Sequence, residues 1–220
     1  MGLERQPEEY VAALVGVFKE VRRVLRSDGS LWLNVGDVYA ASGKGGGGKQ
    51  GDRHAWATVK DRKGFRMPPA GYKMKDLTLV AFQLADALRK SGWYLRSTII
   101  WKKPSAVEPM RLDRPAVSHE YVFLLTKAEH SSVRNPGEKW FGHSVWEIGV
   151  ERSADHPAAF PVELARRCII AGSPEGGTVL DCFGGHGTTG LAAQLSGRNA
   201  ILCELNPEYI DSAKRRLADA

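Results

Sequence analysis

The sequence predicts an α/β fold in which helices cover both faces of a mostly parallel sheet. Segments with apolar residues at three- and four-residue steps alternate with short, continuous apolar runs, as expected for helices that connect buried parallel strands. Near the C-terminus, the stretch VLDCFGGHGTTGLAA (residues 179–193) places a glycine turn between such a run and a helix-like segment. Because the chain has 220 residues and no internal repeat, we expect a single domain over residues 1–220.

The first part of the chain contains two expected helices and three expected strands. Pro7 suits a first helical turn, and apolar residues recur on one face as far as Leu25, which predicts a helix ended by Asp28 and Gly29. Residues 30–37 (SLWLNVGD) predict a short buried strand. Residues 75–92 predict an amphipathic helix, and strands are expected at 93–101 and 120–126.

Two regions break this alternation. Residues 41–75 include four consecutive glycines, which predicts a flexible insertion that becomes ordered only on binding. A second irregular region covers residues 127 to about 158. After it, we predict a helix at 160–172, a strand at 178–183, a helix at 188–197, a strand at 199–205 and a closing helix at 207–220.

The charge distribution favours a polyanionic partner. The formal net charge is +6, and residues 41–75 carry nine Lys or Arg against Asp52 and Asp61, a local balance of +7. A nucleic acid is therefore a candidate partner, with a solvated basic loop as the alternative. The three cysteines and six histidines show no metal-ligand spacing. Sparse cysteines, no signal-peptide region and no long apolar run favour a cytoplasmic protein without a membrane span.

The glycine turn contains the pattern G-x-G-x-x-G at Gly185, Gly187 and Gly190. Between a strand and a helix, this pattern brings the backbone close to a ligand and directs the first N–H groups of the helix toward it. Glu204 ends the next strand, where an acid can accept hydrogen bonds from a ribose diol. Three interpretations follow: a tight turn without a ligand, a nicotinamide dinucleotide site, or a site for S-adenosylmethionine (AdoMet).

Three features favour AdoMet. Asp181 at the strand end can accept from the cationic methionine ammonium, whereas it would repel a pyrophosphate. A dinucleotide fold needs a second βαβ half after the first, and the sequence stops at Ala220. Thr188 and Thr189 place two hydroxyls at the start of the helix, which suits a polar amino-acid tail.

These residues also carry a family resemblance. Residues 179–217 resemble the C-terminal AdoMet-binding block of DNA amino-methyltransferases, the N4-cytosine and N6-adenine enzymes of the circularly permuted β-type arrangement. Residues 8–37, 92–104 and 113–127 are similar to other segments of that family, and His186 stands where the family usually has Ser or Ala. The positions that match the family pattern are Asp181, Phe183, Gly185, Gly187, Thr188, Thr189, Gly197, Arg198, Glu204, Tyr209, Ala213, Arg216 and Leu217.

The resemblance implies the fold of AdoMet-dependent methyltransferases, a Rossmann-like, doubly wound sheet. Its strands follow one another along the chain in circularly permuted order, which accounts for the late position of the glycine turn. It also implies that Phe160 and Pro161 wrap the methionine end of the cofactor; a helix-start proline beside a core Phe is the alternative. The cofactor-binding residues that it implies are Asp181, Phe183, Gly185, Gly187, Thr188, Thr189, Glu204, Asn206, Phe160 and Pro161.

The catalytic motif of that family is missing. The chemistry rests on Asp/Asn/Ser-Pro-Pro-Tyr/Phe, whose first side chain and a backbone carbonyl accept the amino N–H bonds of a flipped base while the aromatic ring stacks on it. The only Pro-Pro here follows Met67 and precedes Ala70, so no catalytic residue is assigned. The resemblance places the motif strand between the strands at 178–183 and 30–36, so its absence would split the sheet at its centre.

Two explanations for the missing motif stay open. The chain is a truncated enzyme, inactive alone, or it is a natural remnant, phage-borne for example, or half of a split enzyme that works with a partner chain. Truncation is the favoured explanation.

Further residues are candidates for contact with DNA. Asn34 and Asp37 can line the target-base pocket, with a strand-end turn as the alternative. Trp101 can stack on a base and Lys103 can contact a phosphate, with core packing of the Trp as the alternative. Sequence specificity is expected from residues 41–75 and 127–146. The predicted phosphate contacts in the basic loop are Lys44, Lys49, Arg53, Arg62, Lys63 and Arg66.

The leading hypothesis is a site-specific methyltransferase that transfers a methyl group from AdoMet to N6 of adenine or N4 of cytosine in double-stranded DNA, with the target base flipped out. A non-catalytic remnant that binds DNA or AdoMet is the second hypothesis. A methyltransferase of RNA or of a small molecule is the third, and the basic loop and the whole-chain resemblance count against it. Adenine and cytosine stay open, because the motif that hints at the choice is absent.

Overall fold

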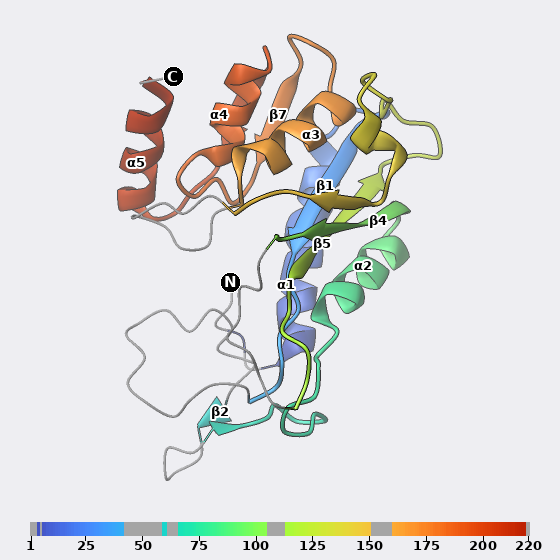
Figure 1. The fold of residues 1–220 in the computed structure, drawn as a ribbon, viewed down its shortest axis with the longest axis vertical. Coiled ribbons are helices and arrows are strands. Elements are labelled where there is room, and N and C mark those ends of the chain that lie inside the picture. The colour runs from blue at the N-terminus through green and yellow to red at the C-terminus, as the bar shows by residue number, and fades with distance from the viewer. Residues whose placement is uncertain are drawn as a thin grey trace.

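The computed structural model describes residues 4, 6–41, 59–60, 66–104, 113–150 and 160–218. Within these residues the strands form a four-stranded sheet in the order β1-β5-β4-β6 and two two-stranded sheets, β7-β8 and β2-β3 (Figure 1). The elements are α1 (Pro7–Val24), β1 (Ser30–Val35), β2 (Val59–Lys60), β3 (Arg66–Met67), α2 (Val80–Lys90), β4 (Tyr94–Lys102), β5 (His119–Thr126), the 3₁₀ helix η2 (Lys139–Gly142), β6 (Val145–Glu147), α3 (Val162–Gly172), β7 (Thr178–Asp181), α4 (Thr188–Leu195), β8 (Asn199–Leu202) and α5 (Pro207–Ala218).

The four-stranded sheet is mostly parallel in strand direction, as the sequence predicts, because β1, β4 and β6 point the same way and only β5 is reversed. β5 runs antiparallel to both β1 and β4, and within this sheet only β6 runs parallel to its neighbour, β4. The reason lies in the connection between β4 and β5, which contains no helix in its described part. A parallel neighbour needs a longer crossover, usually helical, whereas an antiparallel neighbour needs only a return of the chain.

One face of this sheet carries the larger core, beneath α1 and α2. Because side chains alternate between faces along a strand, Leu31 and Leu33 of β1 share this face with Phe123 of β5. They pack against apolar residues of both helices, including Phe18 and Leu84, each no more than 2% exposed. Figure 1 shows α1 and α2 side by side along the sheet.

The opposite face of the sheet is covered by α3. Trp32 of β1, Val122 of β5 and Trp101 of β4 lie on this face and pack with Trp146 of β6 and Leu164 of α3. The rings of Trp32 and Trp146 stack with their centroids 6.1 Å apart. Helices therefore cover both faces, as the sequence predicts.

The C-terminal unit contains β7, α4, β8 and α5. β7 and β8 pair in parallel, and α4 packs on α3 through small and aliphatic side chains such as Ala192 and Ile169. In Figure 1 this unit lies at the upper left, beside α3. Among the described residues, no hydrogen-bonded ladder joins it to the four-stranded sheet, and β1 and β7 each pair with one strand only. The sheet is therefore in two parts.

The predicted elements are present, with differences where long-range hydrogen bonds outweigh the local pattern. α2 begins at Val80 and not near residue 75, since Thr78 N donates to Val38 O and Ala40 N donates to Asp76 O, which holds residues 75–79 in a turn. β6 and η2 lie in the region predicted to be irregular. A strand as short as β6 has too few residues for alternation and is defined by its pairing with β4. None of the helices in the described part is long and apolar enough to cross a membrane.

Replacing Phe123 with alanine should destabilise the fold strongly. Phe123 is fully buried in the core beneath α1 and α2, and such a truncation leaves a cavity that costs about 3–5 kcal/mol. Urea unfolding should give this loss, while the control Val24→Ala, at a side chain 57% exposed, should change stability by less than about 0.5 kcal/mol. Equal losses in the two variants would contradict the placement of this core.

Candidate functional site

The glycine turn lies between β7 and α4. β7 ends at Asp181, and the chain then passes through Gly185 and Gly187, whose φ angles of 51° and 80° are left-handed and favour glycine. A Cβ on Gly185 would meet nothing nearer than 3.9 Å, so the backbone there faces open space. A Cβ on Gly187 would lie 3.0 Å from the Cβ of Ala213 in α5. Gly185 thus suits close approach of a ligand, and Gly187 suits close packing of α5.

Asp181 organises this turn. Its Oδ1 accepts from the backbone N–H of Phe183 at 2.9 Å, and its Oδ2 accepts from the hydroxyl of Thr189 at 2.5 Å. Two bonds leave lone pairs on both oxygens, since a carboxylate has about four acceptor positions. The carboxylate is held in place by the turn and can still accept from a cationic ligand.

The two threonine hydroxyls have partners within the protein. Thr189 donates to Asp181, and Thr188 Oγ1 accepts from Arg216 Nη1 of α5 at 3.0 Å. Both threonines are at most 9% exposed. Their first function is therefore to fasten the start of α4, and contact with the cofactor's amino-acid tail stays a prediction.

Glu204 follows β8 and reaches back to the glycine turn. Its Oε2 accepts from Gly185 N at 2.9 Å, and its Oε1 accepts from Leu205 N and Asn206 N, each at 2.8 Å. Burial alone would raise the pKa of Glu204, but these three backbone donors outweigh it and hold the pKa below its ordinary value. Glu204 is therefore an anion beside the turn at neutral pH.

Asn206 and His186 tie α5 to this unit. Asn206 Oδ1 accepts from Glu208 N at 3.0 Å, so it caps the first turn of α5. His186 Nδ1 lies 2.8 Å from Ser212 Oγ, and its ring centroid lies 4.4 Å from that of Tyr209. The contact of Asn206 with the cofactor stays a prediction.

Phe160, Pro161 and Phe183 lie where the C-terminal unit meets the larger sheet. Phe160 packs both on the α3 face of the sheet and on the contact between α3 and α4, and Pro161 precedes the first residue of α3. Phe183 is 47% exposed, with its ring centroid 6.4 Å from that of Phe18 in α1. Phe160 is therefore near both halves of the sheet, as a residue at the cofactor's methionine end would be.

These residues fit AdoMet. Gly185 offers open backbone, and two carboxylates, Asp181 and Glu204, stand at the ends of adjacent parallel strands. Two negative charges suit a cofactor with a sulfonium and an ammonium, and they disfavour a pyrophosphate. Ligands of open α/β sheets bind outside the carboxyl ends of the strands, which is where these groups lie.

A second polar cluster lies at the carboxyl end of β1. Asn34 Nδ2 donates to Glu120 Oε2 and to the Tyr121 carbonyl, each at 3.1 Å, and Lys103 Nζ donates to Glu120 Oε1 at 2.5 Å. Lys103 Nζ also lies 4.5 Å from the centroid of the Trp101 ring. Glu120 bonds to both Asn34, 86 residues away in sequence, and Lys103, 17 residues away. No spacing in the sequence indicates these contacts.

The predictions for Trp101 and Lys103 need correction. Trp101 is 3% exposed, packs in the core of the α3 face and donates its indole N–H to the Ile148 carbonyl at 2.9 Å. Lys103 is 8% exposed and its ammonium is paired with Glu120. Neither side chain presents a surface to a DNA backbone, because the sheet buries both. Lys102, the neighbour of both, is exposed and pairs with Glu147 at 2.6 Å.

Asp37 has a different environment from Asn34. Its Oδ1 accepts from Val38 N, the Thr78 hydroxyl and Val80 N, at 2.8, 2.9 and 3.3 Å, so it holds the start of α2. Its Oδ2 is buried, with no hydrogen-bond partner among the described residues. Burial raises the pKa of Asp37, and the bonds to Thr78 and the backbone only partly oppose the shift. Asp37 therefore caps the start of α2. Its place in the target-base pocket stays a prediction.

Most of the predicted loop contacts cannot be placed. Lys44, Lys49, Arg53, Arg62 and Lys63 lie outside the described residues, and of Arg66 only the backbone, in β3, is described. Their contact with DNA remains a prediction.

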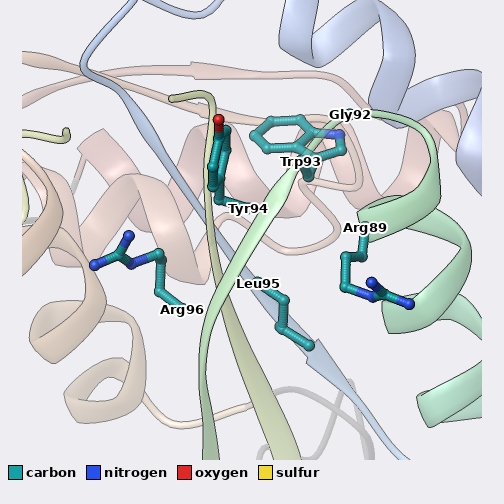
Figure 2. Close-up of a pocket in the computed structure, with 6 residues that line it drawn as sticks. All are labelled: Arg89, Gly92, Trp93, Tyr94, Leu95 and Arg96. Carbon is teal, nitrogen blue, oxygen red and sulfur yellow. The ribbon is translucent and has the colours of Figure 1, made fainter. Parts of the chain in front are cut away.

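An open hollow at the other end of β4 is separate from the site. Figure 2 shows the residues that line it, around the loop between α2 and β4. Because β4 begins beside this hollow and ends beside Lys103, the length of the strand separates the two. The lining residues are Arg89, Gly92, Trp93, Tyr94, Leu95 and Arg96.

Comparison with known proteins shows the family of the chain. The family model described as DNA methylase, for N6 and N4 methyltransferases, matches residues 1–215. The chain is 41% identical over 234 residues to the Type II methyltransferase M.SmaI of Serratia marcescens, a match that covers 99% of this chain and 77% of that protein. It is also 41% identical to M.Cfr9I of Citrobacter freundii, over 99% of this chain and 74% of the relative.

Solved structures resemble the fold. A putative DNA modification methylase of Thermus thermophilus, complexed with S-adenosyl-L-methionine, superposes with a TM-score of 0.68 at 28% identity, over 96% of this chain and 78% of the other. The cytosine-N4-specific PvuII DNA methyltransferase gives a TM-score of 0.75 at 22% identity, over 96% and 71%, a likeness of fold.

Replacing Gly187 with alanine should destabilise the glycine turn more than the same change at Gly71. Both glycines have left-handed φ angles, 80° and 84°, so each variant loses about 1–2 kcal/mol from the backbone alone. The added methyl at Gly187 would also press on Ala213, whereas at Gly71 it meets nothing within 4 Å. Urea unfolding of both variants measures the difference, and equal losses would contradict the packing of α5 on the turn.

Proposed function

Because this chain belongs to the family of DNA amino-methyltransferases, which take their methyl group from AdoMet, we propose that it is a site-specific enzyme that acts on N6 of adenine or N4 of cytosine. The observation that supports this most directly is the pair of carboxylates, Asp181 and Glu204, on either side of an open glycine turn. AdoMet would supply an electrophilic methyl group on a sulfonium. In this proposal the residues of this chain bind AdoMet, and the catalytic motif that the 220 residues lack holds the acceptor base beside the methyl group.

Each carboxylate has a distinct role in this proposal. Asp181, oriented by Phe183 N and Thr189 Oγ1, accepts from the methionine ammonium. Glu204 has three backbone donors and about one acceptor position remaining, which takes a ribose hydroxyl. The negative charge of both favours the cationic cofactor over its neutral thioether product, which helps product release. Phe160 lies at the methionine end.

The proposed reaction needs no thiolate, and two of the cysteines are poorly suited to supply one. Burial raises the pKa of Cys168 to about 12, and burial with the nearby charge of Asp181 raises that of Cys182 to about 11. Both thiols are therefore protonated at neutral pH and poor nucleophiles. Transfer to an exocyclic amino group needs only groups that accept its N–H bonds and hold the base close to the methyl group.

We further propose that catalysis needs an Asp/Asn/Ser-Pro-Pro-Tyr/Phe motif that these 220 residues do not contain. The two-part sheet supports this, because β1 and β7 each have one edge without a strand partner among the described residues. A strand between them would complete a continuous sheet in circularly permuted order. Truncation of an enzyme and one half of a split enzyme both agree with this arrangement.

AdoMet should bind the chain, and Asp181→Ala should weaken that binding. Loss of a charge-assisted hydrogen bond to the ammonium should raise Kd about tenfold or more, measured by isothermal titration. Asp211→Ala, in α5 and outside the turn, is the control and should bind as the unchanged chain does. Absence of binding by the unchanged chain, or equal binding by Asp181→Ala, would overturn the assignment of the turn.

The chain alone should transfer no methyl group to unmethylated plasmid DNA, because the groups that hold the amino nitrogen are missing. Fusion at the N-terminus to a motif-bearing segment of a family member should restore transfer from labelled AdoMet. The same fusion with the Pro-Pro-Tyr/Phe residues changed to alanine is the control. Mass spectrometry of the nucleosides then separates N6-methyladenine from N4-methylcytosine. Full activity of the chain alone would contradict the need for the motif.

A further inference from the structure

Three segments that are distant in sequence meet beyond the carboxyl end of β1. Tyr39 lies shortly after β1, and Lys75 N donates to the carbonyl of the next residue, Ala40, at 3.0 Å. Lys75 Nζ in turn lies 2.7 Å from Asp113 Oδ2. Because β5 runs antiparallel to β1, residues 113–114, which precede β5, lie at the same end of the sheet. The two ends of the basic insertion, residues 41–75, therefore meet here.

The guanidinium of Arg114 lies directly over the ring of Tyr39. Its Cζ is 3.7 Å from the ring centroid, and the side chain is 17% exposed. Stacking of this kind orients a guanidinium without using any of its five N–H donors. Nε is buried and has no hydrogen-bond partner among the described residues. The two Nη groups are therefore the end of the side chain that a ligand can reach.

Asp113 does not satisfy the hydrogen-bonding groups of Arg114. Arg114 Nη1 lies 3.5 Å from Asp113 Oδ1, too far for a strong hydrogen bond, whereas Lys75 Nζ lies 2.7 Å from Oδ2. The hydrogen bond from Lys75 lowers the pKa of Asp113, so this carboxyl is ionised at neutral pH and one carboxylate faces two cations. In the part of the chain that the structure describes, no group accepts a hydrogen bond from the Arg114 guanidinium.

An arginine in this environment suits an anionic ligand. Burial removes part of the hydration of the guanidinium, and neither Tyr39 nor Asp113 replaces the lost hydrogen bonds. Two oxygens of a phosphate would replace them, since the planar fork of an arginine can donate two parallel N–H bonds to such a group. The site also lies at the carboxyl end of β1, and open α/β sheets bind their ligands outside the carboxyl ends of the strands.

We propose that Arg114 binds a phosphate of the DNA backbone and that Tyr39 is the positioning residue for its guanidinium. This inference rests on the proposed function and deepens it, because it names a contact with the DNA substrate. Lys75, whose side chain is 65% exposed, places a second cation beside the same site. A phosphate contact fixes the position of the duplex and carries no sequence information, since the backbone is the same at every base.

Duplex binding tests this contact without methyl transfer. Binding of the chain to a fluorescently labelled duplex of mixed sequence is measured by anisotropy between about 50 and 200 mM salt, without AdoMet. Arg114→Met should raise Kd about fivefold or more at low salt and should reduce the slope of log K against log salt by about 1, because one phosphate is no longer neutralised. Arg96→Met removes the same charge at the start of β4, at the other end of the sheet, and is the matched control that should leave both nearly unchanged.

Variants of the stacked pair test the positioning role. Tyr39→Leu keeps the charge of Arg114 but removes the ring, so it should raise Kd with the salt slope nearly unchanged. Tyr39→Phe keeps the ring and should bind DNA as the unchanged chain does. Arg114→Lys keeps the charge without the planar fork, so it should recover the slope but not the full affinity. Urea unfolding and titration with AdoMet are the controls for the fold and the glycine turn in each variant.

Each outcome decides part of the inference. Unchanged Kd and slope in Arg114→Met, or an equal effect in Arg96→Met, overturns the phosphate contact. If Arg114→Met does not fold, full affinity in both Arg114→Lys and Tyr39→Leu overturns it instead. Equal binding by Tyr39→Leu and Tyr39→Phe overturns the positioning role and keeps the contact. Failure of the unchanged chain to bind AdoMet refutes the proposed cofactor site, while duplex affinity, read without AdoMet, still tests Arg114.

Discussion

Acidic side chains at the carboxyl ends of strands hold the turns on which this structure depends. Asp181 after β7, Glu204 after β8 and Asp37 after β1 each accept backbone N–H groups from the segment that follows. The N–H groups at a strand-to-helix turn have no partner in the strand or helix, so each turn needs an acceptor. The turns that bring ligand-binding groups to this edge of the sheet are thereby fixed. The same carboxylates give this edge of the sheet its negative charge, which would suit a cationic cofactor.

Much of the fold could be predicted because its signals are local. The glycine turn, with Asp181 before it and Glu204 after it, lies within 25 residues, and the structure brings these residues together through the bond from Gly185 N to Glu204. The helices and longer strands likewise follow from apolar periodicity. The reversed direction of β5 and the presence of β6 could not be predicted in this way, since strand direction and a three-residue strand depend on partners distant in sequence.

The candidate base site shows where sequence reasoning stopped. Asn34 was a candidate because it ends a strand, but its partner Glu120 lies 86 residues away, and a turn of Asn, Gly and Asp explains the sequence equally well. Lys103 was predicted to contact a phosphate, but the structure buries it against Glu120 and Trp101. The contacts of Glu120 with Asn34 and Lys103 join three segments that are distant in sequence. A local sequence pattern carries no information about such contacts.

The two faces of the four-stranded sheet differ in their packing, and this difference explains how the polar cluster of Asn34, Glu120 and Lys103 is tolerated. Beneath α1 and α2 the packing is almost wholly apolar, with Phe123 and Leu125 fully buried, and it stabilises the sheet without the network. The α3 face also has an apolar core, but its margin beside Asn34 carries charge, and the C-terminal unit attaches there through Phe160. A sheet stabilised mainly from one side can hold costly polar groups on the other. The ion pair of Lys103 and Glu120 lies at the margin of this face and is linked through Asn34 to β1, whose other edge has no strand partner among the described residues.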